Sequence, residues 1–326
     1  MSPKVTSCRA IEPDLVAAAI GEASPAAVVR VQHHVHSCEP CLREMERYQS
    51  IDRVVGDLRR APAGADRTDT ALGELEYKLA ELRRRAVTAR VWSSPLGPIL
   101  IARSDQGVVL VEYLESARGA AASRMLRGRG IEVLEDGGET EQFHQQILEY
   151  LAGERTRLAW PLDFRLAGSD FQREVLQVTA ALPYGAVTSY ARLAREMGRP
   201  TAVRAVAQAL RHNPLPIVVP CHRVVGGTGA LTGYAGNKLG LKERLLSLEG
   251  VPIAHTRREG HVVRDAMYVV ADHDTQYCVP TCGSLPTLPL WRLTLFASRE
   301  RAESSGLAPC TDCRPDLHPL STQLKL

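Results

Sequence analysis

The spacing of apolar and polar residues predicts a small α/β domain over residues 88 to 166. Three short apolar runs are separated by the turn sequences Ser94–Gly97 and Ser104–Gly107. Apolar runs between turn residues are typical of strands joined by hairpins. From Thr140 to Ala152 the apolar side chains instead recur at helical spacing. We therefore expect strands followed by one helix.

Three helical patterns follow between residues 171 and 250, and the last is marked by Leu241, Leu245 and Leu248. Residues 190–197 and 202–211 each have helical spacing, and a Gly-Arg-Pro sequence separates them. The second of these helices is rich in alanine, so its backbone can approach a DNA groove closely while Arg204 projects from it. We predict a helix-turn-helix here. Packing of the second helix in a core is the alternative.

The ends of these elements carry local signals. Thr188 or Ser189 can cap the first helix, and Thr201 can cap the second. Ile217–Val219 is an apolar run bounded by prolines, which predicts a buried strand or extended segment. Glycines between residues 226 and 236 indicate a loop whose backbone can touch a ligand.

Helical patterns also occupy both ends of the chain. Apolar residues between 15 and 35 suit short helices, and a further helix runs from residue 39 towards Arg60. After a linker at 62–66, leucines at helical spacing mark a charged helix. Residues 291–305 read as a strand followed by a helix.

The composition is that of a globular protein: the 326 residues suffice for several domains, and 44% are hydrophobic. No apolar stretch approaches the ~20 residues that span a bilayer, so we expect no membrane contact and a cytoplasmic location. The net charge is only +3, but residues 169–258 hold twelve basic and five acidic residues, a net charge of +7. Such a segment suits contact with phosphates.

One cysteine stands apart from the other seven, in the sequence Pro220-Cys221-His222-Arg223-Val224. A thiol is a poor nucleophile until it loses its proton, because its free pKa is ~8.5. A neighbouring base and positive charge activate it, and His222 and Arg223 can supply both. By itself, a Cys-His pair is equally compatible with a buried core or a metal site.

The other seven cysteines form two terminal clusters that suggest metal sites. The candidate ligands are Cys278, Cys282, Cys310 and Cys313 near the C-terminus, and Cys8, His34, Cys38 and Cys41 near the N-terminus. Four such ligands are the number that a closed zinc site needs. His33 or His36 can replace His34. At the N-terminus, exposed histidines and free thiols are the alternative.

From Phe171 to Gly250 this succession resembles the active-site domain of the O6-alkylguanine-DNA alkyltransferases, the methylated-DNA-protein-cysteine methyltransferases. The resemblance implies a helical, winged-helix-type DNA-binding domain preceded by a ribonuclease-H-like α/β domain. It also implies stoichiometric transfer of a methyl or other alkyl group from O6-alkylguanine, and from O4-alkylthymine, in double-stranded DNA to Cys221. After one transfer the protein is spent.

The same resemblance implies roles for further residues. His222, oriented by Glu249, draws the proton from Cys221 through a water. Arg204 fills the gap left when the damaged base is flipped out of the duplex. Asn213 braces these hydrogen bonds, and Tyr190 donates a hydrogen bond to the leaving guanine. Arg223 holds the site together. The residues that line the pocket are Gly233, Tyr234 and Ala235.

The two terminal clusters resemble two different zinc domains. Residues 265–316 resemble the zinc domain of Ada-like adaptive-response proteins, whose first cysteine accepts methyl groups from DNA phosphotriesters. Cys278 has that position, but Val279 and Asp312 stand where that family has positive charge, so we expect structural zinc. Residues 1–60 resemble zinc-binding anti-sigma factors, which implies a sigma factor or another regulator as partner.

The predicted architecture is an α/β multidomain protein flanked by two small zinc-binding domains. The predicted segments are 1–60, a linker and connecting helix at 61–87, 88–166, 167–254, a linker at 255–264, 265–316 and a tail at 317–326. The alternative to repair is a sensor of alkylated DNA that acts through its zinc domains. Alkyltransferase-like sensors lack the acceptor cysteine, and Cys221 is present here.

Overall fold

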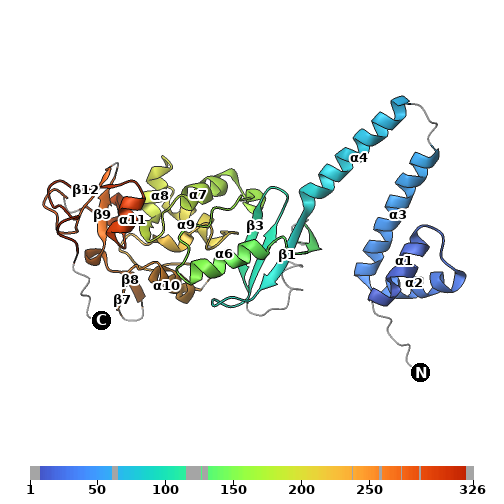
Figure 1. The fold of residues 1–326 in the computed structure, drawn as a ribbon, viewed down its shortest axis with the longest axis horizontal. Helices are drawn as coiled ribbons and strands as arrows, with labels where there is room; N and C mark the ends of the chain where they lie inside the picture. The colour runs from blue at the N-terminus through green and yellow to red at the C-terminus, as the bar shows by residue number, and fades with distance from the viewer. Residues whose placement is uncertain are drawn as a thin grey trace, which may run out of the picture. The chain divides into compact units, whose positions relative to one another are not determined.

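The computed structural model describes residues 8–60, 65–114, 126, 131–236, 238–256, 259–272, 274–285 and 288–320. The contacts divide the chain into two units, Met1–Glu81 and Leu82–Leu326 (Figure 1). Within the described ranges, no helix has the length and apolar character needed to cross a membrane.

The described residues of the first unit form helices where the sequence predicts them. They are α1 (Cys8–Ala19), α2 (Pro25–Ser37), α3 (Glu39–Arg60) and the greater part of α4 (Ala65–Arg85). The apolar faces of α1, α2 and α3 meet in a small core that contains Ile11, Leu15, Val31 and Cys41. α4 continues beyond Glu81 into the second unit.

A four-stranded sheet and one helix form the first part of the second unit. The elements are β1 (Ala86–Trp92), β2 (Ile99–Arg103), β3 (Val108–Tyr113), β4 (Glu132–Glu135) and α6 (Glu141–Leu151). The strand order is β3-β2-β1-β4, and only β4 runs parallel to its neighbour. Phe143, Ile147 and Tyr150 of α6 are buried in one core with Ile99 and Ile101. The predicted strands and helix are confirmed.

The two helices of the predicted helix-turn-helix are also present. This segment contains η1 (Phe164–Leu166), α7 (Asp170–Ala180), β5 (Ala186–Ser189), α8 (Tyr190–Glu196) and α9 (Val203–Arg211). Ser189 caps α8, because its hydroxyl accepts a hydrogen bond from the N–H of Arg192 at 3.2 Å. The predicted cap at Thr201 is wrong. A turn in which Ala202 N–H donates to Arg199 O at 2.9 Å moves the helix start past Thr201.

The segment before Cys221 is a buried turn, whereas the sequence predicts an extended segment. The N–H of Val219 donates to Leu215 O at 2.8 Å, and Ile217 has a left-handed φ of 74°. Pro216 and Pro220, which bound the predicted run, lack the N–H donors that a strand ladder needs, which favours the turn. The elements that follow are η2 (Cys221–Arg223), β6 (Val224–Val225) and α10 (Leu239–Leu248).

A second four-stranded sheet joins the C-terminal residues to the segment that contains α7, α8 and α9. Its strands have the order β6-β5-β11-β9, in which the new members are β9 (Tyr268–Ala271) and β11 (Leu293–Phe296). β11 is antiparallel to both of its neighbours, and β5 is parallel to β6. Val187, Val269 and Leu295 are fully buried in one core on this sheet.

The remaining elements complete the C-terminal part. They are β7 (Ile253–Thr256), β8 (Glu259–Val262), η3 (Arg264–Ala266), β10 (Gln276–Tyr277), η4 (Leu290–Arg292), α11 (Arg299–Ser304) and β12 (Ala308–Pro309). β7 and β8 pair as an antiparallel hairpin, which takes up most of the stretch predicted as a linker. β10 and β12 pair in parallel.

Candidate active site

Cys221 begins η2, and its side chain is almost completely buried, with 5% exposure. Asn213 Nδ2 donates to Cys221 Sγ at 3.1 Å and to Val219 O at 2.9 Å. Burial raises the pKa of Cys221, while the hydrogen bond from Asn213 and the charge of Lys242 act in the opposite direction. The thiol is therefore protonated at neutral pH and needs a base before it can react.

His222 and Glu249 form a fully buried pair, with His222 Nε2 2.8 Å from Glu249 Oε1. A carboxylate can only accept, so Nε2 carries the ring proton. Nδ1 of His222 is buried and has no hydrogen-bond partner among the residues that the structure describes. Burial lowers the pKa of His222, although Glu249 opposes the effect. His222 is therefore neutral at neutral pH, and Nδ1 is the nitrogen that can take up a proton.

Several donors converge on the carboxylate of Glu249. Arg223 donates through Nε at 2.9 Å and Nη2 at 2.8 Å, and the N–H of Gly185 donates at 2.8 Å. The hydroxyl of Tyr150 and Nε2 of His222 complete the set. Burial alone would raise the pKa of Glu249, but His222 and Arg223 hold it well below its usual range. The carboxylate is charged and its orientation is fixed from several sides.

The predicted pocket residues lie in the loop that follows β6 and on α8. Tyr190 donates its hydroxyl hydrogen to Thr232 O at 3.1 Å, and Tyr234 is buried. Burial, and to a smaller extent the nearby Cys221, raise the pKa of both tyrosines. Gly233 and Ala235 both have positive φ values, of 44° and 39°. Such a conformation is uncommon for alanine and is found preferentially at functional sites.

Lys242 is a site residue that the sequence analysis missed. Its Nζ donates to Val224 O at 2.6 Å and to Thr232 O at 2.8 Å, so it ties the pocket loop to β6. Burial lowers the pKa of Lys242 to about 8, which leaves it charged at neutral pH. Its spacing in the sequence could have identified it, because Lys242 falls on the same buried helical face as Leu245 and Glu249.

Two further unpredicted tyrosines reach the site from the first sheet and its helix. Tyr150, on α6, donates to Glu249, and its hydroxyl lies 3.4 Å from His222 Nε2. Tyr113, on β3, pairs its hydroxyl with that of Tyr234 at 2.9 Å. Tyr150 lies on the apolar face of a predicted helix. No sequence signal places Tyr113 beside a loop 121 residues further along the chain.

Arg204 is exposed on α9, as predicted. Val206 on the same helix is fully buried, whereas Ala205 next to Arg204 is exposed and adds little bulk. Gln172 of α7 fixes the other end of α9, because its Nε2 donates to Ala209 O at 3.1 Å. Arg204 thus projects beside the small side chain of Ala205, while Gln208 and Arg211 are exposed further along α9.

The C-terminal cysteines come together as a candidate metal centre. The four are Cys278, Cys282, Cys310 and Cys313, and their Sγ atoms all lie within 4.8 Å of one another. The first three are buried and the last is partly exposed. Tyr277, next to the first pair in sequence, accepts a hydrogen bond from the N–H of Cys310 at 3.0 Å, which brings the two pairs together. Four thiolates at this spacing fit tetrahedral zinc.

The N-terminal ligands also come together within 4.8 Å, and they are Cys8, His34, Cys38 and Cys41. His34 is the histidine of this group: its Nε2 lies 3.3 Å from Cys41 Sγ. Cys8 Sγ lies 3.7 Å from Cys38 Sγ, so the start of α1 meets the segment between α2 and α3. Three cysteines and one histidine are a donor set that zinc commonly has.

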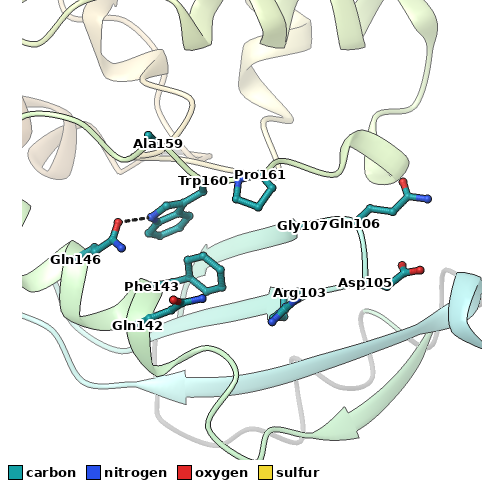
Figure 2. A pocket seen from close by; sticks show the side chains of 10 residues that line it. All are labelled: Arg103, Asp105, Gln106, Gly107, Gln142, Phe143, Gln146, Ala159, Trp160 and Pro161. Atoms are coloured by element: carbon teal, nitrogen blue, oxygen red, sulfur yellow. Dashed lines mark hydrogen bonds between the residues drawn. The ribbon is translucent and has the colours of Figure 1, made fainter.

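A separate hollow of about 220 Å³ lies between the β2–β3 turn and α6 (Figure 2). Its wall includes Phe143 and Trp160, and the indole N–H of Trp160 donates to Gln146 Oε1 at 2.8 Å. No predicted site residue lines this hollow, which belongs to the packing of the first sheet.

Comparisons with known proteins agree with this site. Two family models match: the ribonuclease-like domain of 6-O-methylguanine DNA methyltransferase over residues 87–164, and its DNA-binding domain over residues 170–251. Both terminal clusters lie outside the matched ranges.

Individual relatives match the same central part. The methylated-DNA–protein-cysteine methyltransferase of Methanosarcina acetivorans is 38% identical over 166 residues, which cover 49% of this chain and 96% of the relative. The constitutive enzyme of Bacillus subtilis is 50% identical over 107 residues, covering 33% and 64%. The crystal structure of the Mycobacterium tuberculosis O6-methylguanine methyltransferase matches with a TM-score of 0.43 and 37% identity over 50% and 92% of the two chains. The chain belongs to the methylated-DNA–protein-cysteine methyltransferase family.

Proposed function

We propose that Cys221 is the acceptor in the transfer of an alkyl group from O6-alkylguanine, and from O4-alkylthymine, in double-stranded DNA. The observation that carries this proposal is a buried thiol followed directly by a neutral histidine whose Nε2 is bound to a charged carboxylate. The other seven cysteines lie in the two clusters. Only Cys221 combines a single thiol with an adjacent base.

His222 acts as the base. Because Glu249 fixes the proton on Nε2, the lone pair of Nδ1 receives the proton of Cys221 through a water. The thiolate then attacks the alkyl carbon, and the carbon–oxygen bond to the guanine breaks with its electron pair on the base. Tyr190 donates a hydrogen bond to the leaving guanine as this charge develops.

The product is a thioether on Cys221, and no group of the site returns it to a thiol. Each protein molecule therefore transfers one alkyl group. The charge of Lys242 and the amide of Asn213 stabilise the transient thiolate, since both lower the pKa of Cys221 against the effect of burial.

The helix-turn-helix brings the damaged base to this site. A base inside a paired duplex is out of reach of Cys221, so the nucleotide must be flipped out. Arg204 enters the gap that the base leaves, and the small exposed side chain of Ala205 next to it lets α9 approach the groove. The net charge of +7 over residues 169–258 supports binding to the phosphates. Because its substrate is DNA, we place the protein in the cytoplasm, at the nucleoid.

Zinc is the metal that best fits the C-terminal cluster, as a structural ion. When bound there, it links the segments that carry Cys278 and Cys310 through metal–sulfur bonds. Acceptance of a methyl group from a phosphotriester by Cys278 is less favoured. Its side chain is only 4% exposed, and Asp312 lies where a phosphate would need positive charge.

The N-terminal unit takes a second zinc and a protein partner. Its donor set of three cysteines and His34 fits zinc on chemical grounds. The resemblance of residues 1–60 to zinc-binding anti-sigma factors favours a sigma factor or another regulator as the partner. Co-purification of tagged full-length protein with and without a zinc chelator tests this, and a partner retained equally in both would contradict zinc-dependent binding.

Intact-protein mass spectrometry after mixing with a duplex that contains O6-methylguanine tests the acceptor reaction. We expect the mass of one methyl group per protein, and no further product with excess duplex. Product formed beyond one equivalent would refute stoichiometric transfer. Binding to the duplex without any gain in mass would instead favour the sensor function.

A further inference from the structure

A continuous series of backbone pairings runs from the C-terminal cysteine cluster to the centre of the second sheet. Cys278 and Val269 exchange two hydrogen bonds, each with an N–O distance of 2.9 Å. Val269 of β9 pairs with Leu295 of β11, and Leu295 pairs with Val187 of β5. The cluster is therefore only three strand pairings away from β5, which pairs with β6, the strand after the acceptor segment.

β5 contacts the segment of the acceptor cysteine directly. Thr188 of β5 pairs in parallel with Val224, the residue that follows Arg223. Val187 and Val225 are fully buried in the same apolar core as Leu295. Because close-packed interiors transmit displacements, a shift of β11 would be felt at β5 and β6.

Gly185, just before β5, connects the C-terminal part to Glu249. The N–H of Gly185 donates to Glu249 Oε2 at 2.8 Å, and its carbonyl oxygen accepts from Ala297 N–H at 2.8 Å. Gly185 has a φ of 71°, and a Cβ there would lie 3.2 Å from Arg301 Cγ. Gly185 is thus held between the carboxylate of Glu249 and Ala297, the residue that follows β11.

Arg301 reinforces this contact from α11. Its guanidinium lies 4.5 Å from the ring centre of Tyr184, and the Tyr184 hydroxyl donates to Leu248 O at 3.1 Å. Leu248 directly precedes Glu249 in the chain. Arg301 therefore holds both the residue before Gly185 and, through Tyr184, the residue before Glu249.

α8, which carries Tyr190, is also held by C-terminal residues. Arg192 forms an ion pair with Asp272, and both side chains are largely buried. The guanidinium of Arg195 lies 4.5 Å from the ring centre of Trp291 in η4. The C-terminal part thus supports the first helix of the helix-turn-helix as well as Glu249.

We propose that the C-terminal part is a built-in support of the alkyl-transfer site, in which Ala297 and Arg301 position Glu249, and the cysteine cluster holds their strand and helix in place. Ala297 and Arg301 are positioning residues, because neither touches Cys221 or His222. The inference rests on the proposed roles of Cys221, His222 and Glu249. It predicts that transfer at Cys221 depends on the state of a cluster that takes no part in the chemistry.

The rate of alkylation of Cys221 by free O6-benzylguanine tests the proposal without any contribution from DNA binding. Arg301→Ala should lower this rate about tenfold, within the ~10²-fold that a misplacement of ~1 Å can cost. The acid limb of its pH–rate profile should move to lower pH, because a loosened Glu249 raises the pKa of His222 less. If Arg301→Ala only reduced the fraction of folded protein, fewer molecules would become alkylated, but the pH–rate profile would not move.

Two matched variants of α11 accompany this measurement. Arg301→Lys keeps a cation near Tyr184 and should restore most of the rate. Glu300→Ala changes an exposed neighbour on the same helix and should react like the wild type. Equal rates and profiles for Arg301→Ala and the wild type would overturn the positioning role.

The cluster is tested in the full chain with Cys313→Ser, which alters its most exposed cysteine, and with Thr281→Ser as the control in the neighbouring loop. Cys313→Ser should lose one zinc, show faster amide hydrogen exchange in β11 and β5, and alkylate Cys221 more slowly. Loss of zinc with unchanged exchange and rate would overturn the link to the cluster.

The two possible failures are distinguishable. If the wild type itself gains no alkyl group, the proposed function is wrong. If the wild type reacts and the variants match it, only the supporting role is wrong. If Cys313→Ser does not fold, Arg301→Ala decides, because it leaves all four cysteines in place.

Discussion

The surroundings of Cys221 and of Cys278 show how the same side chain is used in two ways in one chain. Both thiols are almost completely buried. Cys221 is the single thiol of its site and meets an amide from Asn213 and the nearby charge of Lys242. Cys278 meets three further thiols within 4.8 Å. A lone thiol beside a base suits transfer, whereas four converging thiols suit a metal.

The two sites nevertheless belong to one packed unit. β6, which follows Cys221, and β9, which precedes Cys278, lie in the same sheet. The N-terminal cluster differs in this respect, because its ligands surround a small helical core in a separate unit. Although the two clusters have similar ligands, loss of the metal from the C-terminal cluster should affect the alkyl-transfer site, and loss from the N-terminal cluster should not.

Among these variants, Cys221→Ala should have the largest effect on alkyl transfer. It should abolish alkyl transfer completely but retain binding to duplex DNA, because the basic segment and Arg204 supply the binding. Transfer is measured by the increase in protein mass, and binding by fluorescence anisotropy at fixed salt. Residual transfer at the wild-type rate would mean that a clustered cysteine is the acceptor.

Glu249→Gln should lower the rate of transfer by about 10²-fold or more, within the range expected for general base catalysis. The glutamine leaves Arg223 buried without its counter-charge and His222 without an anionic partner. The rate with O6-benzylguanine, where no DNA is needed, is the measurement. A loss of less than threefold would show that the carboxylate does not serve His222.

The same carboxylate predicts a pH dependence of stability. The folded-state pKa of Glu249 lies well below its ordinary value of 4.5, so the stabilisation is complete above that value. It is lost as the pH falls below 4.5 towards the folded-state pKa. Urea unfolding of the wild type should therefore show a steeper loss of stability in acid than Glu249→Gln, and parallel acid dependences would contradict the assignment.

Arg204→Ala should weaken repair of duplex DNA strongly and alkylation by free O6-benzylguanine only slightly. An inserted side chain stabilises the flipped state, and a free base has no stack to leave. Arg211→Ala removes the same charge from the end of α9 and serves as the matched control. Equal losses for Arg204→Ala on both substrates would contradict insertion into the duplex.

Lys242→Met should destabilise the fold by about 1–3 kcal/mol, because buried carbonyl groups lose their donor. The folded-state pKa of Lys242 is about 8, below its ordinary value of 10.5. The unfolded chain binds more protons between these values, so this group makes stability rise with pH there. Urea unfolding between pH 8 and 10 should show this rise in the wild type, and its persistence in Lys242→Met would assign it elsewhere.

The smallest expected effect is a change in zinc content. The full chain should bind two zinc ions, and Cys313→Ser should bind one. Metal analysis after gel filtration measures this. Two ions retained by Cys313→Ser would show that the C-terminal thiols do not hold the second one.

Local patterns predicted the helices around the site, whereas the roles of most site residues came from the family resemblance. Helical spacing and the Gly-Arg-Pro stop predicted α8 and α9, and the Cys-His pair marked the acceptor. Glu249 lies close in sequence to the end of α10, but its link to His222 came from the family resemblance. Thr201 failed as a cap because a turn shifted the start of α9 by one residue.

The remaining features depend on contacts between distant parts of the chain. No periodicity shows that β11 pairs with β5, although this pairing joins the C-terminal part to the site. The hydroxyl contacts of Tyr113 and Tyr150 likewise arise only when the first sheet and its helix pack against the DNA-binding segment. The role of Lys242 could have been predicted from the sequence, since a lysine on an apolar helical face needs buried acceptors.

The most direct test of the central claim is to map the alkyl group after the full-length protein reacts with a duplex that contains O6-methylguanine. Peptide mass spectrometry identifies which of the eight cysteines carries it. We expect one methyl group, on Cys221 alone, with Cys278 and the other six cysteines unmodified. A methyl group on Cys278, or on any other cysteine in place of Cys221, would contradict this account.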